Sequence, residues 1–280
     1  MQKPASLIYL TEDDVQKSMT IAHAVKLAEK GIQADSCGDV AGDKFYMPAG
    51  LAGDSFIKPF AGYLKGEEFA FVKTFSYNPD NMEDFDLPVT SSVILLFDVQ
   101  NGLPVCIMEG NWVTGLRTAA STTVTAKVLA RRNSEVITII GAGLQGSMHM
   151  CAMAEGFDLR KANIIDISPE AASKLVARFE AKLEFPIKPI SIEQREEAIR
   201  ESDIILTVTT GNQPLVEYPW LKPGVFLAKL GSYGEIAPDI ILEADKVIVD
   251  DWRYVSPRIP ELKELIQSGS FNVENIHAEW

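Results

Sequence analysis

Cysteine and histidine are scarce in this sequence, which limits its options for disulfides and metal sites. The 280 residues include three cysteines and three histidines. Cys37, Cys106 and Cys151 are odd in number and lack CxxC spacing, so we expect free thiols in a reducing compartment. The histidines lie far apart and none has an HExxH-type partner, so we expect no metal site.

The sequence also lacks an excess of positive charge and a long apolar segment. Lysine and arginine number 26 against 39 acidic residues, and the formal charge of −13 is spread along the chain. Nucleic-acid binding needs clustered Lys and Arg, so we expect no such partner, although two or three cations suffice for a small anionic ligand. No apolar run reaches signal or membrane-spanning length, and we expect a cytoplasmic protein without a membrane partner.

The first part of the chain predicts an α+β fold with an antiparallel sheet. A helix is expected from Glu12 to Asp35, capped by Thr11. Asn101 and Gly102 separate two β-like segments, which is a strong hairpin signal. The expected strands are Leu7–Leu10, Lys44–Met47, Phe56–Leu64, Phe69–Phe75, Val93–Asp98 and Leu103–Met108.

The pattern changes near Gly115 to alternating helices and strands. The β-like run ends on Asn111 and Trp112, and we expect a helix from Leu116 onward. Continuous apolar strands that alternate with helices are typical of a parallel, doubly wound sheet. The expected strands are Glu135–Ile140, Ala162–Ile165, one near Ile187, Ile204–Val208, Val225–Lys229 and Val247–Val249, and the expected helices are Leu116–Arg131, Leu144–Glu155, Pro169–Ala181 and Ile192–Arg200.

The segment GAGLQG matches the GxGxxG pattern of a dinucleotide-binding turn. It directly follows an expected strand and opens an expected helix, whose N-terminus would bind phosphates. Gly141 permits the tight turn, Gly143 lets the backbone approach a pyrophosphate, and Gly146 lets helix and strand pack closely. Leu144 and Gln145 complete the loop, and an ordinary glycine turn is the alternative.

An acidic residue and two threonines extend this candidate site. Asp166 lies about 20 residues past Gly146 at the end of the next strand, where an acid binds ribose hydroxyls. It repels a 2′-phosphate, and the neighbouring Ile167 and Ser168 supply no arginine, so we expect NAD rather than NADP. Thr209 and Thr210, in VTTGNQPLV, fit either the nicotinamide ribose or a capped loop.

Several segments together resemble the ornithine cyclodeaminase/mu-crystallin family of nicotinamide-dependent proteins. They are TGLRTAA, IIGAGLQG, DIILTVTT, KPGVFLAKLGS and AFVKTFSYNPDN, and the similarity covers nearly the whole chain. The resemblance implies an α/β protein with a Rossmann-like, NAD-binding domain of residues 116–280 and an α+β substrate domain of residues 1–115 that also forms a homodimer. It places Thr118 and Gly231 near the cofactor.

In that family the LRT arginine and the VK lysine contact the substrate carboxylate, which here implies Arg117 and Lys73. An Arg in the first turn of a helix can present a bidentate fork. An ammonium in the aromatic strand FAFVKTF is costly without an anionic ligand. The alternatives are a structural ion pair for Arg117 and a solvent-facing edge-strand lysine for Lys73. Lys44 loosely matches a further basic substrate-binding residue.

The sequence departs from the family in two places. Cyclodeaminating members carry an Asp where this chain has Ser232, and a hydroxyl has no basic pKa near neutrality. Lys73 then becomes the candidate proton donor or acceptor, because desolvation lowers a lysine pKa. The family also continues past the segment resembling NIHAEW, with a stretch that completes the nucleotide sheet and a final helix, whereas this sequence stops at Trp280.

The combination predicts an NAD-dependent oxidoreductase that transfers hydride at the Cα–N bond of a small amino or imino acid. Lys73 and Ser232 are the candidate catalytic residues. Two alternatives remain: a cyclodeaminase-type lyase that releases ammonia, and a cofactor-dependent small-molecule binding protein.

Overall fold

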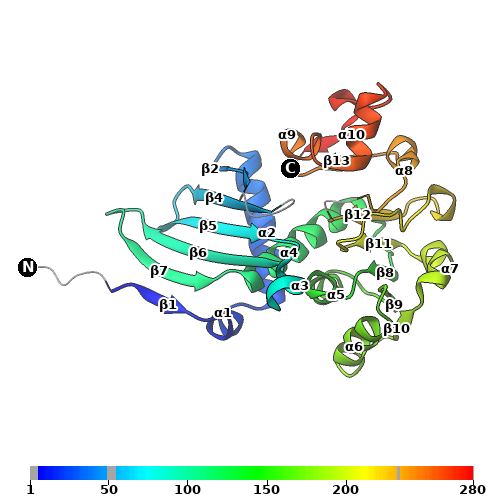
Figure 1. Cartoon of the computed structure of the whole chain (residues 1–280), viewed down its shortest axis with the longest axis horizontal. Helices are drawn as coiled ribbons and strands as arrows, with labels where there is room; N and C mark the ends of the chain where they lie inside the picture. The colour runs from blue at the N-terminus through cyan, green and yellow to red at the C-terminus, as the bar shows by residue number, and fades with distance from the viewer. Residues whose placement is uncertain (1–5, 49–54, 232–233, 280) are drawn as a thin grey trace, which may run out of the picture. The chain divides into compact units, whose positions relative to one another are not determined.

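The computed structural model describes residues 6–48, 55–231 and 234–279. The chain divides into two compact units, Met1–Arg117 and Thr118–Trp280, each built on its own sheet (Figure 1). Within the described residues, no helix combines the length and the apolar character needed to cross a membrane.

The first unit is built on a seven-stranded, mostly antiparallel sheet. Its strand order is β1-β7-β6-β5-β4-β2, with β3 paired to β4 and β1 parallel to β7 (Figure 1). The strands are β1 (Ile8–Leu10), β2 (Val40–Lys44), β3 (Met47–Pro48), β4 (Phe56–Leu64), β5 (Phe69–Tyr77), β6 (Thr90–Asp98) and β7 (Pro104–Glu109), and a short helix α3 (Asn81–Phe85) follows β5.

The N-terminal helix expected from Glu12 to Asp35 is in fact two helices, α1 (Glu12–Ser18) and α2 (Ile21–Ser36). The reason is a second N-cap. Met19 is extended, and the Thr20 hydroxyl accepts a hydrogen bond from the backbone N–H of His23, which starts a new helix. Thr11 caps α1 in a capping box with Asp14.

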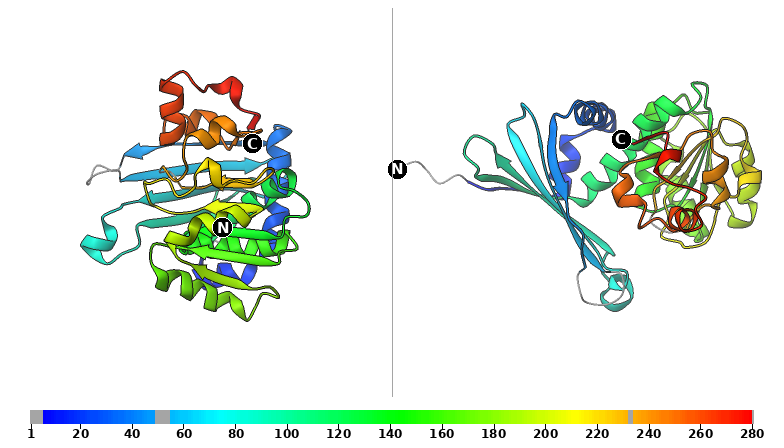
Figure 2. Two further views of the ribbon diagram at one scale, coloured as in Figure 1. Left: turned by 90° about the vertical axis from the view of Figure 1, so that its right-hand side faces the viewer. Right: turned by 90° about the horizontal axis from the view of Figure 1, so that it is seen from above.

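The two faces of this sheet differ in exposure. Lys73, Ile94 and Cys106 share one face by register and are buried, whereas Thr74 and Val93 on the opposite face are exposed. Helix α2 runs along one face of the sheet (Figure 2). The sheet therefore has one protected face, which holds Lys73.

Helix α4 (Asn111–Leu129) begins five residues before the expected Leu116, where the sequence predicted the end of a β run. The Glu109 carboxylate accepts hydrogen bonds from the backbone N–H groups of Asn111 and Trp112, at 2.7 and 3.4 Å, and so caps the helix. Arg117 consequently lies in the second turn and not the first. Its placement owes less to the helix N-terminal field than the sequence implied.

The second unit is built on a five-stranded parallel sheet with the order β10-β9-β8-β11-β12 (Figure 1). Its interior is aliphatic and includes Ile139, Ile164 and Leu206, which have no exposed surface. The strands are β8 (Val136–Ile140), β9 (Lys161–Ile165), β10 (Ile187–Ile190), β11 (Ile204–Thr207) and β12 (Phe226–Lys229), and the helices between them are α5 (Leu144–Gly156), α6 (Pro169–Glu180), η1 (Ile192–Gln194), α7 (Arg195–Glu201) and η2 (Tyr218–Trp220).

The strand expected at Val247–Val249 does not extend this parallel sheet. Strand β13 (Ile248–Val249) pairs with β14 (Ala278–Glu279) in a separate two-stranded sheet. Asn272 caps the short helix before β14, and the His277 N–H then donates to the Val247 carbonyl. The remaining helices are α8 (Asp239–Glu243), α9 (Trp252–Val255), α10 (Pro260–Gln267) and η3 (Val273–Asn275).

Candidate active site

The glycine loop lies at a topological switch point of the parallel sheet. Strand β8 pairs with β9 on one side and with β11 on the other, so the chain order reverses at β8. The loops that follow β8 and β11 leave the same carboxyl edge of the sheet. In doubly wound sheets a crevice at this position binds the ligand.

The three glycines of the loop differ in the space that surrounds them. Gly141 has a φ of +116°, and a Cβ there would lie 2.7 Å from the carbonyl oxygen of Val208. A Cβ at Gly146 would lie 2.0 Å from the carbonyl oxygen of Gly141, so any side chain would force apart the strand and the helix. A Cβ at Gly143 would meet nothing within 4 Å. The structure itself therefore requires Gly141 and Gly146, whereas the surroundings of Gly143 are open.

Helix α5 begins in this loop and suits an anionic group. Its N-cap is Gly143, so no side chain caps its first N–H groups. The Oε1 atom of Gln145 is buried and has no hydrogen-bond partner among the described residues. Leu144 is exposed beside it. The residues present thus fit a dinucleotide: an uncapped helix N-terminus for the pyrophosphate and an unsatisfied amide within the same loop.

Asp166 organises the loop after β9. Its two carboxylate oxygens accept hydrogen bonds from the backbone N–H groups of Ala142, at 2.7 Å, and Ser168, at 2.9 Å. A carboxylate has about four acceptor positions, so capacity remains for ribose hydroxyls. The Ser168 hydroxyl caps α6 through the Ala171 N–H, and Ile167 is 90 % exposed. An exposed isoleucine at this edge offers an apolar surface to the adenine base of a dinucleotide.

A buried glutamate, which sequence reasoning did not assign to the site, joins the loops after β11 and β12. Glu235 has no exposed surface, and its Oε1 accepts from the N–H and the hydroxyl of Thr209, at 2.7 and 2.6 Å. Its Oε2 accepts from the Thr207 hydroxyl and the Gly231 N–H, both at 3.0 Å. The Thr209 hydroxyl proton is therefore committed to Glu235, whereas Thr210 is exposed.

Two further charged groups lie near Glu235, the half-buried Lys229 and the buried Glu261. Lys229 donates to the Gly231 carbonyl at 2.8 Å, and its Nζ lies 3.6 Å from Glu261. Burial lowers the pKa of Lys229, although the charges of Glu261 and Glu235 act in the opposite direction. Glu235, which stands among apolar residues in GEIAPDI, is the one signal in the sequence that could have indicated this network.

His149 is a packing residue and not an acid or base. It has no exposed surface, and its ring nitrogens contact the Gln145 carbonyl at 2.8 Å and the Thr122 hydroxyl at 3.1 Å. Burial lowers its pKa to about 4, so the ring is neutral near pH 7. It ties α4 to the first turn of α5. His23 and His277 are exposed.

The first unit holds the candidate anion site, centred on Lys73. Strand β5 lies between β4 and β6, and Lys73 is 8 % exposed, so it is not a solvent-facing edge-strand lysine. Its Nζ lies 5.5 Å from the centre of the Phe60 ring. Burial, followed by the positive charges of Arg117 and Lys58, lowers the pKa of Lys73 to about 7. Lys73 and Arg117 are therefore electrostatic neighbours, and their role as a carboxylate clamp stays a prediction.

The other candidate residues differ in how far the structure supports them. Lys44, at the end of the edge strand β2, pairs in register with Phe60, which pairs in turn with Lys73. Paired residues share a face of the sheet, so Lys44 lies in the same row as Lys73. Ser232 falls outside the described residues. The roles of Thr118 and Thr210 stay predictions.

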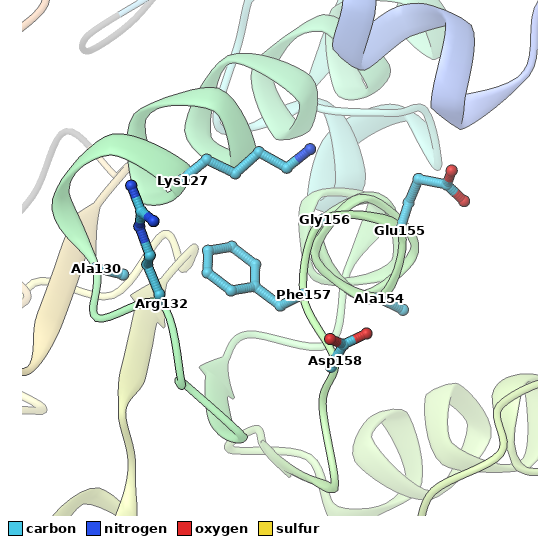
Figure 3. A pocket seen from close by; sticks show the side chains of 8 residues that line it. All are labelled: Lys127, Ala130, Arg132, Ala154, Glu155, Gly156, Phe157 and Asp158. Atoms are coloured by element: carbon cyan, nitrogen blue, oxygen red, sulfur yellow. The ribbon is translucent and has the colours of Figure 1, made fainter.

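A separate surface cavity of about 270 Å³ belongs to the opposite edge of the parallel sheet. It lies between the C-terminal ends of α4 and α5 and the turn before β8, with Phe157 pointing into it (Figure 3). Lys127 and Arg132 are offset by Glu155 and Asp158 around its rim. Because the glycine loop follows the other end of β8, this cavity is not the dinucleotide site.

The strand order and the glycine loop define the second unit as a dinucleotide-binding, doubly wound domain. A profile of the ornithine cyclodeaminase/mu-crystallin family matches residues 7–254, and the chain belongs to that family.

Three similar proteins are informative. N-((2S)-2-amino-2-carboxyethyl)-L-glutamate dehydrogenase from Staphylococcus aureus is 32 % identical over 209 residues, which are 74 % of this chain and 62 % of that protein. Thermococcus litoralis Δ1-pyrroline-2-carboxylate reductase, in complex with NADH and L-proline, superimposes with a TM-score of 0.90 at 28 % identity, covering 97 % of this chain and 84 % of that one. An archaeal alanine dehydrogenase dimer with bound NAD has a TM-score of 0.83 at 25 % identity, over 98 % and 83 % of the two chains.

Substitution of Gly143 separates cofactor binding from folding. We expect Gly143→Ala to leave the urea unfolding midpoint unchanged, because the added Cβ meets no protein atom within 4 Å. NADH affinity should fall by about tenfold or more, equivalent to ~1.4 kcal/mol, because the Cβ occupies the approach to the pyrophosphate. Fluorescence titration with NADH measures this. Gly146→Ala is the matched control and should lower the unfolding midpoint as well. Unchanged NADH affinity in Gly143→Ala would place the pyrophosphate elsewhere.

Glu235→Gln tests the buried network. Each carboxylate oxygen accepts one backbone N–H, so either orientation of the glutamine amide sets its NH₂ against a donor. We expect a loss of about 1–3 kcal/mol in the free energy of unfolding, the cost of a buried donor without a partner. Urea denaturation measures it, and NADH affinity should fall with it. Glu217→Gln, at an exposed position, is the control. A native unfolding curve for Glu235→Gln would contradict the network.

Proposed function

We propose that this protein is an NAD-dependent oxidoreductase that acts at the Cα–N bond of a small amino or imino acid. The observation that carries the proposal is the buried Lys73 beside Arg117, which suits a carboxylate, in a chain whose second unit has a dinucleotide loop. Similar proteins named as a dehydrogenase of an amino-acid derivative and as a reductase bound to NADH and L-proline support it.

The side chains of the first unit have two tasks in this proposal. Arg117 offers a planar fork that binds both oxygens of a carboxylate, and protonated Lys73 adds a second charge. A Lys73 pKa of about 7 also lets its Nζ give or take a proton near neutral pH, at the substrate nitrogen. The nicotinamide supplies or accepts the hydride. Ser232 has no basic pKa near neutrality and is proposed to contact the cofactor without acting as a base.

We further propose NAD rather than NADP as the cofactor. The Asp166 carboxylate accepts two backbone N–H groups and presents its remaining lone pairs at the end of β9. A 2′-phosphate would meet this negative charge without an arginine in Ile167, Ser168 or Pro169 to balance it. The three free thiols, Cys37, Cys106 and Cys151, fit a reducing compartment such as the cytoplasm.

The function is tested by following NADH absorbance and ammonia together. We expect oxidation of NADH with cyclic imines such as Δ1-pyrroline-2-carboxylate, or with keto acids plus an amine. With NAD and ornithine we expect that ammonia does not appear unless NADH is formed with it, because Ser232 stands where the cyclodeaminating members have an Asp. Ammonia without net NADH would indicate the cyclodeaminase instead. Binding of NADH without oxidation by any imine or keto acid would favour a binding protein.

Lys73→Met is the decisive variant for this assay. We expect kcat/KM for imine reduction to fall by about 100-fold or more with NADH affinity unchanged. In the native protein kcat/KM should decline as the pH rises through about 7, because the protonated amine is lost. The variant should lack this decline. Lys65→Met, at an exposed lysine, is the control.

The same variant should gain stability. The folded-state pKa of Lys73 is depressed from 10.5 to about 7, so the unfolded chain binds the proton more tightly. Burial therefore destabilises the fold fully below about pH 7, and the effect disappears as the pH rises past 10.5. Lys73→Met should unfold at higher urea than the native protein, most of all below pH 7. In the activity assay, a kcat/KM for Lys73→Met equal to that of the native protein would show that Lys73 has no part in the mechanism.

A homodimer through the first unit is the proposed assembly. The sheet face opposite Lys73 presents the exposed Val93, and the half-buried Val72, Leu95 and Tyr63 lie on the same face. The archaeal alanine dehydrogenase is a dimer. We expect Val93→Arg to yield monomers by light scattering, because it buries two like charges across a two-fold axis. Val128→Arg, on an exposed residue of α4, should keep the dimer. If the Val93→Arg variant remains a dimer, this sheet face is not the dimer interface.

A further inference from the structure

Both backbone polar groups of Gly231, in the loop after β12, are held by charged side chains. Its N–H donates to the Oε2 atom of Glu235 at 3.0 Å, and its carbonyl accepts from the Nζ atom of Lys229 at 2.8 Å. A Cβ at Gly231 would collide with the Glu235 carboxylate, so the backbone and this carboxylate are in close contact. The backbone at Gly231 is therefore oriented by two side chains, beyond the end of the strand.

The shortest contact of the Lys229 ammonium is with this carbonyl and not with an acid. Only 10 % of the Lys229 side chain is exposed, and a buried ammonium is unfavourable without a counter-charge. Its Nζ lies 3.6 Å from the Oε2 atom of Glu261, which is longer than a hydrogen bond. That Oε2 atom is buried and has no hydrogen-bond partner among the described residues. Glu261 thus supplies charge from α10, while the directed hydrogen bond of Lys229 goes to Gly231.

The loop that holds Gly231 leaves the same edge of the parallel sheet as the dinucleotide loop. Strand β8 pairs with β9 and β11, and β11 pairs in turn with β12. Asp166 follows β9 and the glycine loop follows β8, so the proposed adenosine and pyrophosphate positions lie on one side of β11. A dinucleotide has a nucleoside on each side of its pyrophosphate. The nicotinamide nucleoside of the proposed cofactor would therefore extend towards the loops after β11 and β12.

We propose that Lys229 is a positioning residue for the nicotinamide half of the cofactor, because it holds the Gly231 carbonyl and so fixes the backbone of that subsite. This rests on the proposed function, which takes the adenosine ribose to bind at Asp166. Glu261 acts only through Lys229, as its counter-charge. The alternative is an ion pair between Lys229 and Glu261 that stabilises the fold and has no effect on the cofactor.

Two probes that share one half of the cofactor test the proposal. NADH and ADP have the same adenosine and two phosphates, but only NADH carries the nicotinamide ribose and ring. Both are titrated by calorimetry into the full chain. Lys229→Met removes the donor to Gly231, and we expect NADH affinity to fall about tenfold, with ADP affinity unchanged within about twofold. Lys263→Met, at an exposed lysine of α10, is the control and should bind both probes as the native protein does.

A double variant separates positioning from stability. Lys229→Met alone leaves the Glu261 carboxylate buried without a counter-charge, and it should lower the urea unfolding midpoint. Adding Glu261→Gln removes that charge, so the midpoint should recover. The loss of NADH affinity should persist in the double variant, because the Gly231 carbonyl still lacks its donor.

The outcomes distinguish this inference from the proposed function. Unchanged affinity for both probes in Lys229→Met, an equal loss for both, or recovery of NADH affinity in the double variant overturns the positioning role, even where imine reduction is observed. A loss confined to NADH that persists in the double variant, without turnover of any imine or keto acid, upholds the role of Lys229 and overturns the oxidoreductase.

Discussion

The burial of the Lys73 ammonium group is the constraint on which the first unit depends. An ammonium in an aromatic strand, beside two more cations, raises the free energy of the fold at neutral pH. Nothing in the packing of a seven-stranded sheet requires a lysine there, since a methionine would fill the same space. We therefore propose that Lys73 belongs to a binding site, in which an anionic ligand would stabilise its ammonium group. The depressed pKa follows from the same cause.

In the second unit, buried and half-buried acids stabilise the fold, whereas the buried Lys73 of the first unit destabilises it. Asp166 and Glu235 each accept backbone N–H groups from loops at the carboxyl edge of the sheet, and so fix the shape of that edge. Asp203 does the same at the other edge: burial alone would raise its pKa, but hydrogen bonds from Lys222 and the amides of Glu135 and Val136 lower it to about 2. Part of the acid excess of the chain thus serves as backbone acceptors.

Local rules predicted most elements but not their ends. The glycine turn, the alternation of strands and helices, and the hairpin at Asn101 and Gly102 all depend on nearby residues, and the structure confirms them. The start of α4 was wrong because the Glu109 carboxylate caps it from the preceding strand. The single N-terminal helix was wrong because a second threonine cap interrupts it. Periodicity alone does not reveal a cap made by a side chain.

The sequence by itself determined the dinucleotide loop, the family and the two cations Arg117 and Lys73, because these are carried by contiguous motifs. Only the tertiary structure placed Lys58 beside Lys73, since β4 and β5 are paired by a register that no short motif encodes. It also showed Glu235 as the acceptor that joins two loops, a role that requires residues 26 and 28 positions apart to meet. Contiguous motifs can be recognised in the sequence, whereas charge clusters and buried networks arise from contacts between segments that are distant in the sequence.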